Sequence, residues 1–543
     1  MKNLKLQTPQ GTADCLQEEC AQIRNLENIF REEFIEGGYS EIATPAFEYY
    51  DVFTHDAVPY VQENMIKFFD LNGRILVLRP EMTVPIARVA ATKLLARQDI
   101  LKLFYIQNVY GFLDQSLDSQ AEISQAGVEY IGQSGCEADA EVIALAIKSL
   151  ELAGLKHFKL EIGQVAFFRG LLSGAALDDD QVEKIRALVD AKNTVELDYE
   201  LSKMPISGGL KKKLLALPDL FGENEKVFDM AYSFAQNEES KKAVDNVKQI
   251  YDILVGLQLE KYVSVDFGLL HNYKYYSGII IRGITDEVGS PILSGGRYDN
   301  LLGEFGRPAP ATGFALRIKE IITALNKQNE NKNGSKSYLT IALAKGRLAT
   351  DVQKYLGKCN VDLTEFEDIS RKLILYDDTN NIRFLLVKPA DVPVYVYHGA
   401  ADIGIVGKDT LLEAGLPLYE MLDLKRAKCR MCVAGKAGQD NVKKIATKYP
   451  RVTKMYYDSK GQDIEIIKLN GSIELAPIIG LSDVIVDIVE SGRTLVENGL
   501  SILEDICEVS ARLVVNRVSL KTKSSQIYPL ITQMRQALEE ESC

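Results

Sequence analysis

The sequence predicts two unlike halves, an α+β half followed by an α/β half. In the first half, long helix-compatible segments such as 18–38 are mixed with hairpin-like stretches such as 67–80, whose Asn72-Gly73 pair is typical of a tight turn. In the second half, short apolar runs alternate with amphipathic stretches, which predicts α/β layers with mostly parallel strands. The polar stretch "LNKQNENKNGSKS" at 325–337 separates the halves and is expected to be a linker.

Length and composition limit the possible functions. A chain of 543 residues is too long for one core. A net charge of −13 argues against a general nucleic-acid binder, and no segment has the ~20 consecutive apolar residues of a membrane span. The N-terminus lacks an apolar signal core, and eight cysteines without regular spacing fit a reduced compartment. We therefore expect a cytoplasmic protein that does not bind membranes.

The turn after the apolar run at 484–489 offers groups suited to a phosphorylated ligand. "VIVDIVESGRTLVENG" (484–499) ends a strand in a glycine flanked by hydroxyls and an arginine. Backbone N–H groups at such a strand end and at a helix N-terminus form a cradle for anions, and two acids could hold a ribose diol or Mg²⁺. The pattern also fits a plain helix start capped by Thr494. The candidate contacts are Asp487, Glu490, Ser491, Gly492, Arg493 and Thr494.

Three further segments offer paired cations or a glycine-punctuated turn. They are "ALAKGRL" (342–348) with Lys345 and Arg347, "SRKLI" (370–374) with Arg371, and the glycine-punctuated "AADIGIVGKD" (400–409). Singly, each also fits surface cations or packing glycines. Together they lie where an open α/β sheet gathers its ligands.

With "IATKYP" and "IIKLNGSIELAPIIGLSD", these segments resemble the short-form catalytic subunit of ATP phosphoribosyltransferase over 338–543. The resemblance implies a periplasmic-binding-protein-like fold with two α/β lobes, about 338–428 with 514–543 and about 429–513. It also implies that ATP and phosphoribosyl pyrophosphate are joined, with Mg²⁺, in the first step of histidine biosynthesis. The implied contacts are the 487–494 turn for phosphoribosyl pyrophosphate, Lys345, Arg347 and Arg371 for catalysis, and Asp402, Gly404, Val406 and Gly407 for ATP.

The first half resembles the catalytic core of histidyl-tRNA synthetase over about 1–322. The resemblance rests on "LVLRPEMTVPIAR", "AGVEYIG", "LSGGRYDNLLGEFG" and "ATGFAL". It implies a class II synthetase-like antiparallel sheet with a helical insert at about 170–255. The arginines that clamp ATP in that family are absent, which argues against aminoacyl-adenylate chemistry. Their positions hold Gly111-Phe112-Leu113, Ala121-Glu122-Ile123, His271 and Glu320.

The residues with which that family contacts free histidine are retained. They are Glu81, Thr83, Gln125, Glu129, Tyr275 and Tyr276. No anticodon-binding domain follows the core, so no tRNA partner is expected. This combination resembles the regulatory subunit of ATP phosphoribosyltransferase, and we expect a fused, homo-oligomeric enzyme in which a regulatory domain (1–324) binds histidine as inhibitor. A non-catalytic histidine and nucleotide sensor and a residual synthetase-type activity remain the alternatives.

Overall fold

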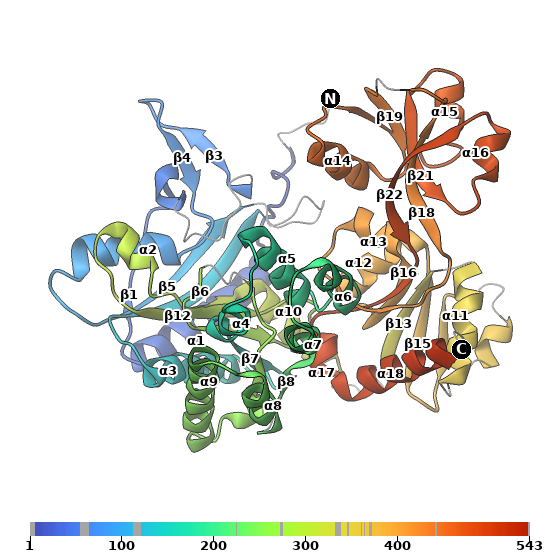
Figure 1. The fold of residues 1–543 in the computed structure, drawn as a ribbon. Coiled ribbons are helices and arrows are strands. Elements are labelled where there is room, and N and C mark those ends of the chain that lie inside the picture. Colours follow the sequence, from blue (N-terminus) through green and yellow to red (C-terminus); the bar gives the residue numbers. More distant parts are fainter. Residues whose placement is uncertain are drawn as a thin grey trace. The chain divides into compact units, whose positions relative to one another are not determined.

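The structure is a computed structural model of the chain. It describes residues 6–540 except 55–63, 112–120, 224, 272–274, 332–337, 345–346, 360, 363, 369–371 and 440–441, and except the side chains of 331, 347–351, 354, 367 and 368. Two compact units are present, residues 1–192 with 196–335 and residues 336–543 with 193–195 (Figure 1). Each unit has its own buried apolar clusters.

The first unit is built on a nine-stranded sheet in the order β1-β5-β6-β12-β11-β10-β7-β9-β8. Only the pairs β1–β5 and β7–β9 are parallel among the described strands, as expected for an α+β half. The strands are β1 (Ser40–Glu41), β5 (Leu101–Tyr110), β6 (Glu122–Ile131), β7 (Lys159–Gln164), β8 (Phe221–Gly222), β9 (Val263–Asp266), β10 (Ile279–Ile284), β11 (Leu293–Arg297) and β12 (Ala311–Arg317).

Alternation along these strands gives the sheet two buried faces. Phe104 on β5 packs into a large cluster with helix residues such as Phe30 and Phe34, whereas the next residue, Tyr105, packs into a second cluster on the opposite face. The helices of this unit are α1 (Gln17–Glu36), α2 (Thr83–Val89), α3 (Cys136–Leu152), α4 (Val165–Leu172), α5 (Asp179–Asp190), α6 (Thr194–Lys203), α7 (Gly208–Ala216), α8 (Lys226–Phe234), α9 (Glu238–Gly256) and α10 (Ile318–Asn331).

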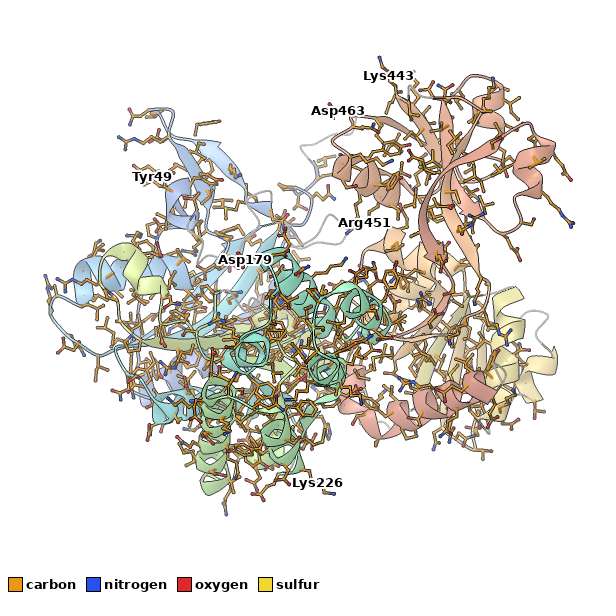
Figure 2. All side chains as sticks on the ribbon, in the orientation of Figure 1. Tyr49, Asp179, Lys226, Lys443, Arg451 and Asp463 are labelled. Atoms are coloured by element: carbon orange, nitrogen blue, oxygen red, sulfur yellow. The ribbon has the colours of Figure 1, made fainter. Side chains whose placement is uncertain are left out.

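Two local expectations can be compared with the first unit. The 67–80 stretch forms the predicted hairpin: β3 (Lys67–Phe69) and β4 (Ile75–Leu78) join β2 (Phe47–Tyr49) in a small sheet from which Tyr49 projects (Figure 2). The predicted linker is too long, because α10 continues to Asn331 and residues 325–331 are therefore helical. Polar composition alone did not reveal that the helix continues beyond the buried apolar residues of its first turns.

The second unit contains two sheets. The first has the order β14-β15-β13-β16-β23-β17 and the second the order β20-β19-β21-β18-β22. Their strands are β13 (Leu339–Ala344), β14 (Ile374–Asp377), β15 (Ile382–Val387), β16 (Ile403–Gly407), β17 (Tyr419–Asp423) and β23 (Ala511–Val515), then β18 (Cys429–Gly435), β19 (Lys444–Thr447), β20 (Glu465–Lys468), β21 (Val484–Val489) and β22 (Ser501–Val509). Since β23 begins at Ala511, the return to the first sheet comes three residues before the predicted 514.

The expectation of mostly parallel strands is wrong for this unit. In the first sheet, β13 is parallel to both neighbours, but β14–β15, β16–β23 and β23–β17 are antiparallel. In the second sheet, β18 is antiparallel to β21 and β22. The chain crosses between the sheets twice, and the strand that follows each crossing, β18 or β23, runs antiparallel to both of its neighbours.

Helices connect and cover the two sheets. They are α11 (Arg347–Lys358), α12 (Val392–Tyr397), α13 (Lys408–Ala414), α14 (Pro450–Ser459), α15 (Leu475–Ile478), α16 (Arg493–Glu497), α17 (Ser519–Thr522) and α18 (Ser524–Glu540). Ile527 and Met534 of α18 are buried with Ile341 of β13, so the C-terminal helix packs on the first sheet (Figure 1).

Candidate functional sites

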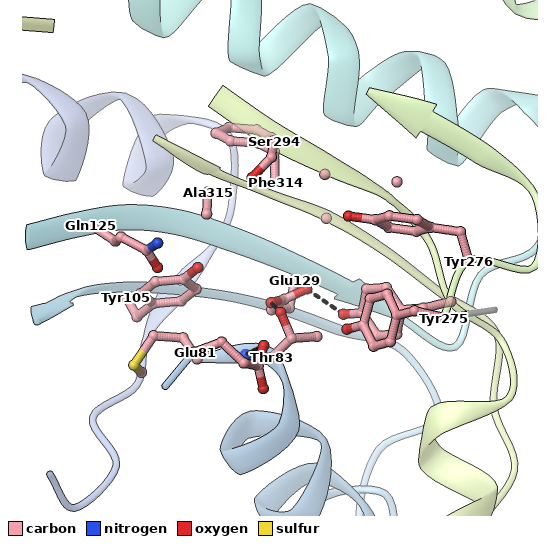
Figure 3. A pocket seen from close by; sticks show the side chains of 15 residues that line it. Glu81, Thr83, Tyr105, Gln125, Glu129, Tyr275, Tyr276, Ser294, Phe314 and Ala315 are labelled. Atoms are coloured by element: carbon pink, nitrogen blue, oxygen red, sulfur yellow. Dashed lines mark hydrogen bonds between the residues drawn. The ribbon is translucent and has the colours of Figure 1, made fainter. Parts of the chain in front are cut away.

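A cavity lies on one face of the nine-stranded sheet, between β5, β6, β11, β12 and the start of α2 (Figure 3). Its volume is about 100 Å³, room for several water molecules. The structure brings together all six residues that the sequence assigned to histidine contact, since Glu81, Thr83, Gln125, Glu129, Tyr275 and Tyr276 all line it. Tyr105, Ser294, Tyr298 and Gly313 are further lining residues that the sequence analysis did not single out.

Two carboxylates dominate the cavity, that of buried Glu129 and that of half-buried Glu81. Glu81 accepts hydrogen bonds from the backbone N–H groups of Thr83 (2.8 Å) and Val84 (2.5 Å). Glu129, on β6, accepts one from the Thr83 hydroxyl (2.7 Å) and one from the Tyr298 hydroxyl. Tyr298 belongs to the "GGRYD" stretch on which the synthetase resemblance partly rests. The sequence analysis used this motif but assigned no role to its tyrosine.

The carboxylates are only partly compensated. Burial raises the pKa of Glu81 to about 7, against the opposing effect of the Val84 and Thr83 hydrogen bonds. Burial raises the pKa of Glu129 to about 8, again against its hydrogen bonds and with help from the charge of Glu81. None of the fifteen described residues that line the cavity is Lys, Arg or His. Such a cavity is suited to a cationic ligand, because only a positive charge would offset both carboxylates.

The rings of Tyr275, Tyr276 and Tyr298 form one end of the cavity, next to Glu129. The rings of Tyr275 and Tyr298 stack with their centroids 5.6 Å apart, and those of Tyr275 and Tyr276 meet edge to face at 5.0 Å. The Tyr275 hydroxyl is buried and makes no hydrogen bond of normal geometry within the described part of the chain. Burial and the nearby carboxylates hold its pKa well above the usual range. A ligand with a hydrogen-bonding ring would give this hydroxyl a partner.

Space beside Glu129 depends on a glycine. A Cβ atom at position 313 on β12 would lie 2.2 Å from Glu129 Oε2 and 2.3 Å from the Val128 carbonyl oxygen. Any side chain there would displace the carboxylate from its hydrogen bonds. Gly313 therefore keeps both the strand pairing and the open cavity.

The positions that hold ATP-clamping arginines in the synthetase family carry no guanidinium here. Ala121 is buried, and the Glu122 carboxylate accepts a hydrogen bond from the Asn108 amide (2.6 Å). Glu320 pairs with Arg317, and His271 is exposed. Leu113 lies outside the described residues.

In the second unit, the turn after β21 has a left-handed glycine. Gly492 has φ +74° and is the N-cap of α16, which is only five residues long. Such a short helix contributes less to anion binding than expected. The backbone N–H groups and side chains of the turn are therefore the main candidate contacts for an anion. No side chain caps α16, so Thr494 is not a helix cap. Ser491, Arg493 and Thr494 are exposed, as is Glu490.

Asp487 stands at the buried end of the same turn. Its Oδ1 atom is buried and has no hydrogen-bond partner among the described residues. Burial raises the pKa of this carboxyl group, with smaller contributions from Glu474 and Asp409. An unbonded carboxylate oxygen beside an open turn is available to a cation or to hydroxyl groups of a ligand.

The prediction of ATP contacts at 402–407 is corrected for three residues. Asp402 is buried, and its carboxylate is bonded to Lys523 (2.8 and 2.9 Å), Ser519 (2.7 Å) and the Thr340 N–H (2.8 Å). A Cβ atom on Gly404 would lie 2.7 Å from Val396, and Val406 is fully buried. These three residues build the sheet. Gly407 alone ends β16 at the start of α13 and stays a candidate for backbone contact with a ligand.

The side chains of the three expected catalytic cations lie outside the described part of the chain. Lys345 and Arg371 lie outside the described residues, and Arg347 begins α11 with its side chain likewise outside. β13 and β16 are parallel neighbours with Leu343 opposite Ile405. Their carboxyl ends, at Ala344 and Gly407, therefore share one sheet edge.

A tyrosine that the sequence analysis did not assign joins helices from the two sheets. The Tyr449 hydroxyl, at the start of α14, donates a hydrogen bond to Asp409 Oδ2 on α13 (2.8 Å). Glu413 of α13 also accepts from the N–H groups of Arg451 (3.0 Å) and Val452 (3.2 Å), the first free donors of α14. Tyr449 belongs to the quoted "IATKYP" segment, which was its sequence signal.

Comparison with known proteins assigns the two units to two families. The histidyl-tRNA synthetase family model matches residues 11–321, and the ATP phosphoribosyltransferase family model matches residues 388–536. The ATP phosphoribosyltransferase regulatory subunit of Acetivibrio thermocellus is 46% identical over 60% of this chain and 78% of its own length. That of Clostridium kluyveri is 38% identical over 71% of this chain and 100% of its own length.

Solved structures give the same picture for the first unit. An ATP phosphoribosyltransferase regulatory subunit/histidyl-tRNA synthetase from Bacillus halodurans is 33% identical, with a TM-score of 0.56, over 65% of this chain and 90% of the other. In the described part of the chain, no helix combines the length and apolar character needed to cross a membrane. The chain belongs to the family of ATP phosphoribosyltransferase regulatory subunits and carries, in the same polypeptide, an ATP phosphoribosyltransferase domain.

Proposed function

We propose that the second unit transfers the phosphoribosyl group of phosphoribosyl pyrophosphate to N1 of ATP, the first step of histidine biosynthesis, and that the first unit binds histidine as a feedback inhibitor. The match to the ATP phosphoribosyltransferase family supports the first part. The cavity with two carboxylates, and with no cation among its described lining residues, supports the second.

The reaction needs charge compensation more than proton transfer. Adenine N1 attacks the anomeric carbon with a lone pair and carries no proton, so the new C–N bond forms as the C–O bond to pyrophosphate breaks without a strong general base. The main tasks are to align two polyanions and to stabilise the departing pyrophosphate. We assign the second task to Lys345, Arg347 and Arg371, together with the backbone at Gly407.

The turn at 487–494 is assigned to phosphoribosyl pyrophosphate. The N–H groups around Gly492 and the hydroxyls of Ser491 and Thr494 would donate to the 5-phosphate, and Arg493 would add charge. Asp487 and Glu490 would accept hydrogen bonds from the ribose hydroxyls. The exposure of this turn and the unbonded Oδ1 atom of Asp487 support these roles.

Magnesium is the cofactor that fits these residues. In the described part of the chain, no three His, Cys, Asp or Glu side chains form a group that could hold a metal ion on its own. Mg²⁺ is usually held by one or two carboxylates together with substrate phosphates, and Asp487 and Glu490 are suited to that arrangement. When bound, Mg²⁺ supplies charge neutralisation at the pyrophosphate. We expect EDTA to abolish the transferase activity and Mg²⁺ to restore it.

Histidine would suit the cavity in charge. Its ammonium group would face the carboxylates, and its imidazole would reach the tyrosine end. Inhibition then requires that histidine bind one state of the protein more tightly than another, because only differential affinity shifts an equilibrium.

The seven described cysteines are free thiols, in keeping with a reduced compartment. On that ground we propose that the protein is cytoplasmic. The class II resemblance is the ground on which we propose a homo-oligomer.

The test measures N1-phosphoribosyl-ATP formed from ATP, phosphoribosyl pyrophosphate and Mg²⁺, with and without histidine. We expect product formation that falls as histidine is added, and an inhibition constant at least about tenfold weaker in Glu81→Ala, which removes a charged hydrogen-bond acceptor. Exposed Glu137 provides the control Glu137→Ala. Product formation indifferent to histidine would refute the regulatory part, and absence of product would favour the non-catalytic sensor. Histidine-dependent exchange of pyrophosphate into ATP would instead reveal residual synthetase activity.

A further inference from the structure

The proposed histidine site leaves one charged group of its ligand without a partner. A free α-amino acid carries a carboxylate beside its ammonium group, and burying that carboxylate unpaired would be costly. The described lining of the cavity contains two carboxylates and no cation. A positive side chain at the margin of the cavity is therefore required, and this inference rests on the proposed histidine site.

Strand register places an arginine at that margin. β12 pairs antiparallel with β6 so that Gly313 lies opposite Glu129, Ala315 opposite Gly127 and Arg317 opposite Gln125. Alternate residues of a strand share a face. Gly313 faces Glu129 and Ala315 lines the cavity, so Arg317 is the next residue on the cavity face.

The neighbour of Arg317 across the strands is itself a cavity residue. Directly opposed residues of an antiparallel pair have Cβ atoms about 4.5–5.5 Å apart. Arg317 therefore leaves the sheet beside Gln125. Figure 3 shows Gln125 and Ala315 at the end of the cavity that is remote from Tyr275 and Tyr276. An imidazole at the tyrosine end would direct the carboxylate of the amino acid toward this end.

The guanidinium of Arg317 is held only loosely. Its described side-chain partner is Glu320, one turn into α10, with Nη1 and Oε1 3.5 Å apart. The other carboxylate oxygen, Oε2, is buried and has no hydrogen-bond partner among the described residues. The Arg317 side chain is 27% exposed. A single long contact of this kind is easily exchanged for a bidentate one with a carboxylate.

We infer that Arg317 binds the α-carboxylate of the amino acid, with the Gln125 amide beside it. The cavity then distinguishes an α-amino acid from the corresponding amine or alcohol by one residue at its margin. Glu320 competes with the ligand for the same guanidinium and lowers the affinity for any carboxylate.

Calorimetric titration of the full-length protein with two ligands tests this inference. Histidine carries the carboxylate, and histidinol has CH₂OH in its place. In the unmodified protein we expect tighter binding of histidine. Arg317→Met should weaken histidine binding about tenfold or more, by loss of charge-assisted hydrogen bonds, and leave histidinol within about twofold. Glu320→Gln should strengthen histidine binding severalfold and leave histidinol unchanged.

Lys319→Met is the matched control. It removes the same charge two residues away, but Lys319 lines a different cavity with Cys20 and Arg24. Arg317→Met weakening both ligands equally, or neither, would overturn the inference while leaving the histidine site intact. Thermal unfolding of each variant checks the fold. Failure of the unmodified protein to bind either ligand would instead refute the histidine site itself, and this inference with it.

Discussion

At the scale of single residues, the cavity of the first unit stands out by its uncompensated charge. Buried carboxylates are normally paired with a cation, because desolvation of a charge costs several kcal/mol. Glu81 and Glu129 instead have hydrogen-bond donors from Thr83, Val84 and Tyr298, and no cation among the described lining residues. The fold tolerates this cost, which the bound ligand would relieve.

The raised pKa values predict that histidine binding strengthens with pH. In the empty cavity, Glu129 is protonated below about pH 8 and Glu81 below about pH 7. A cationic ligand favours the ionised carboxylates, lowers their pKa and so releases protons on binding. Affinity should therefore rise between pH 6 and pH 8, by up to about tenfold per pH unit for each proton released. Titration calorimetry in buffers of different ionisation enthalpy measures both quantities.

Glu129→Gln should flatten this pH dependence as well as weaken binding, since an amide cannot release a proton. Glu137→Gln, on the exposed start of α3, removes a carboxylate outside the cavity and serves as control. Proton uptake on binding, or affinity that falls as pH rises in this range, would contradict the assignment of the ammonium group of histidine to these carboxylates.

At the scale of elements, the turn between β21 and α16 combines an exposed surface with a constrained backbone. Gly492 has φ +74°, a conformation that costs an L-residue about 1–2 kcal/mol. A Cβ atom there would meet only the Val489 side chain, at 3.7 Å. The backbone angle alone therefore demands glycine, and an alanine would be strained without steric clash.

Gly492→Ala should raise the KM for phosphoribosyl pyrophosphate about tenfold, because the strain shifts the N–H groups that we assign to its phosphate. The KM for ATP should change little. Gly499→Ala provides a close control, since Gly499 has φ +69° with open space around its Cβ position and follows the other end of α16. Equal effects of the two substitutions on both KM values would show that only stability is affected.

At the scale of the whole molecule, the chain consists of two units that each contain their own core. The clusters around Phe34 and Phe104 in the first unit and around Ile341 and Leu513 in the second share no residue. Each half contains enough residues to bury a core of its own. Independent folding of the halves is therefore expected.

Separate expression of residues 1–335 and 336–543 tests this expectation and the origin of regulation. Each half should unfold in one cooperative thermal transition. Any activity of the second half alone should be insensitive to histidine, because the cavity lies wholly in the first unit. Titrating the first half back into the assay should restore inhibition. Histidine inhibition of residues 336–543 alone would show that the transferase has its own histidine site.

Local motifs were enough to predict the identity and order of the two units and six of the residues that line the cavity of the first unit. Its motifs are local, and residues within a motif keep their relative positions when the family fold forms. Thus "LRPEMT" supplied Glu81 and Thr83, and "AGVEYIG" supplied Glu129. The prediction of an ATP contact at Asp402 failed because no local motif shows the partners of this residue. Its carboxylate bonds to Lys523 and Ser519, which lie more than 100 residues away along the chain.

Which groups compensate one another depends on the tertiary structure. The pairing of Arg317 with Gln125 depends on the register of β12 against β6, and no local pattern specifies that register. The antiparallel strands β18 and β23 of the second unit likewise each follow a crossing of the chain between its two sheets. Charge compensation depends on distance in space, whereas a sequence motif records only distance along the chain.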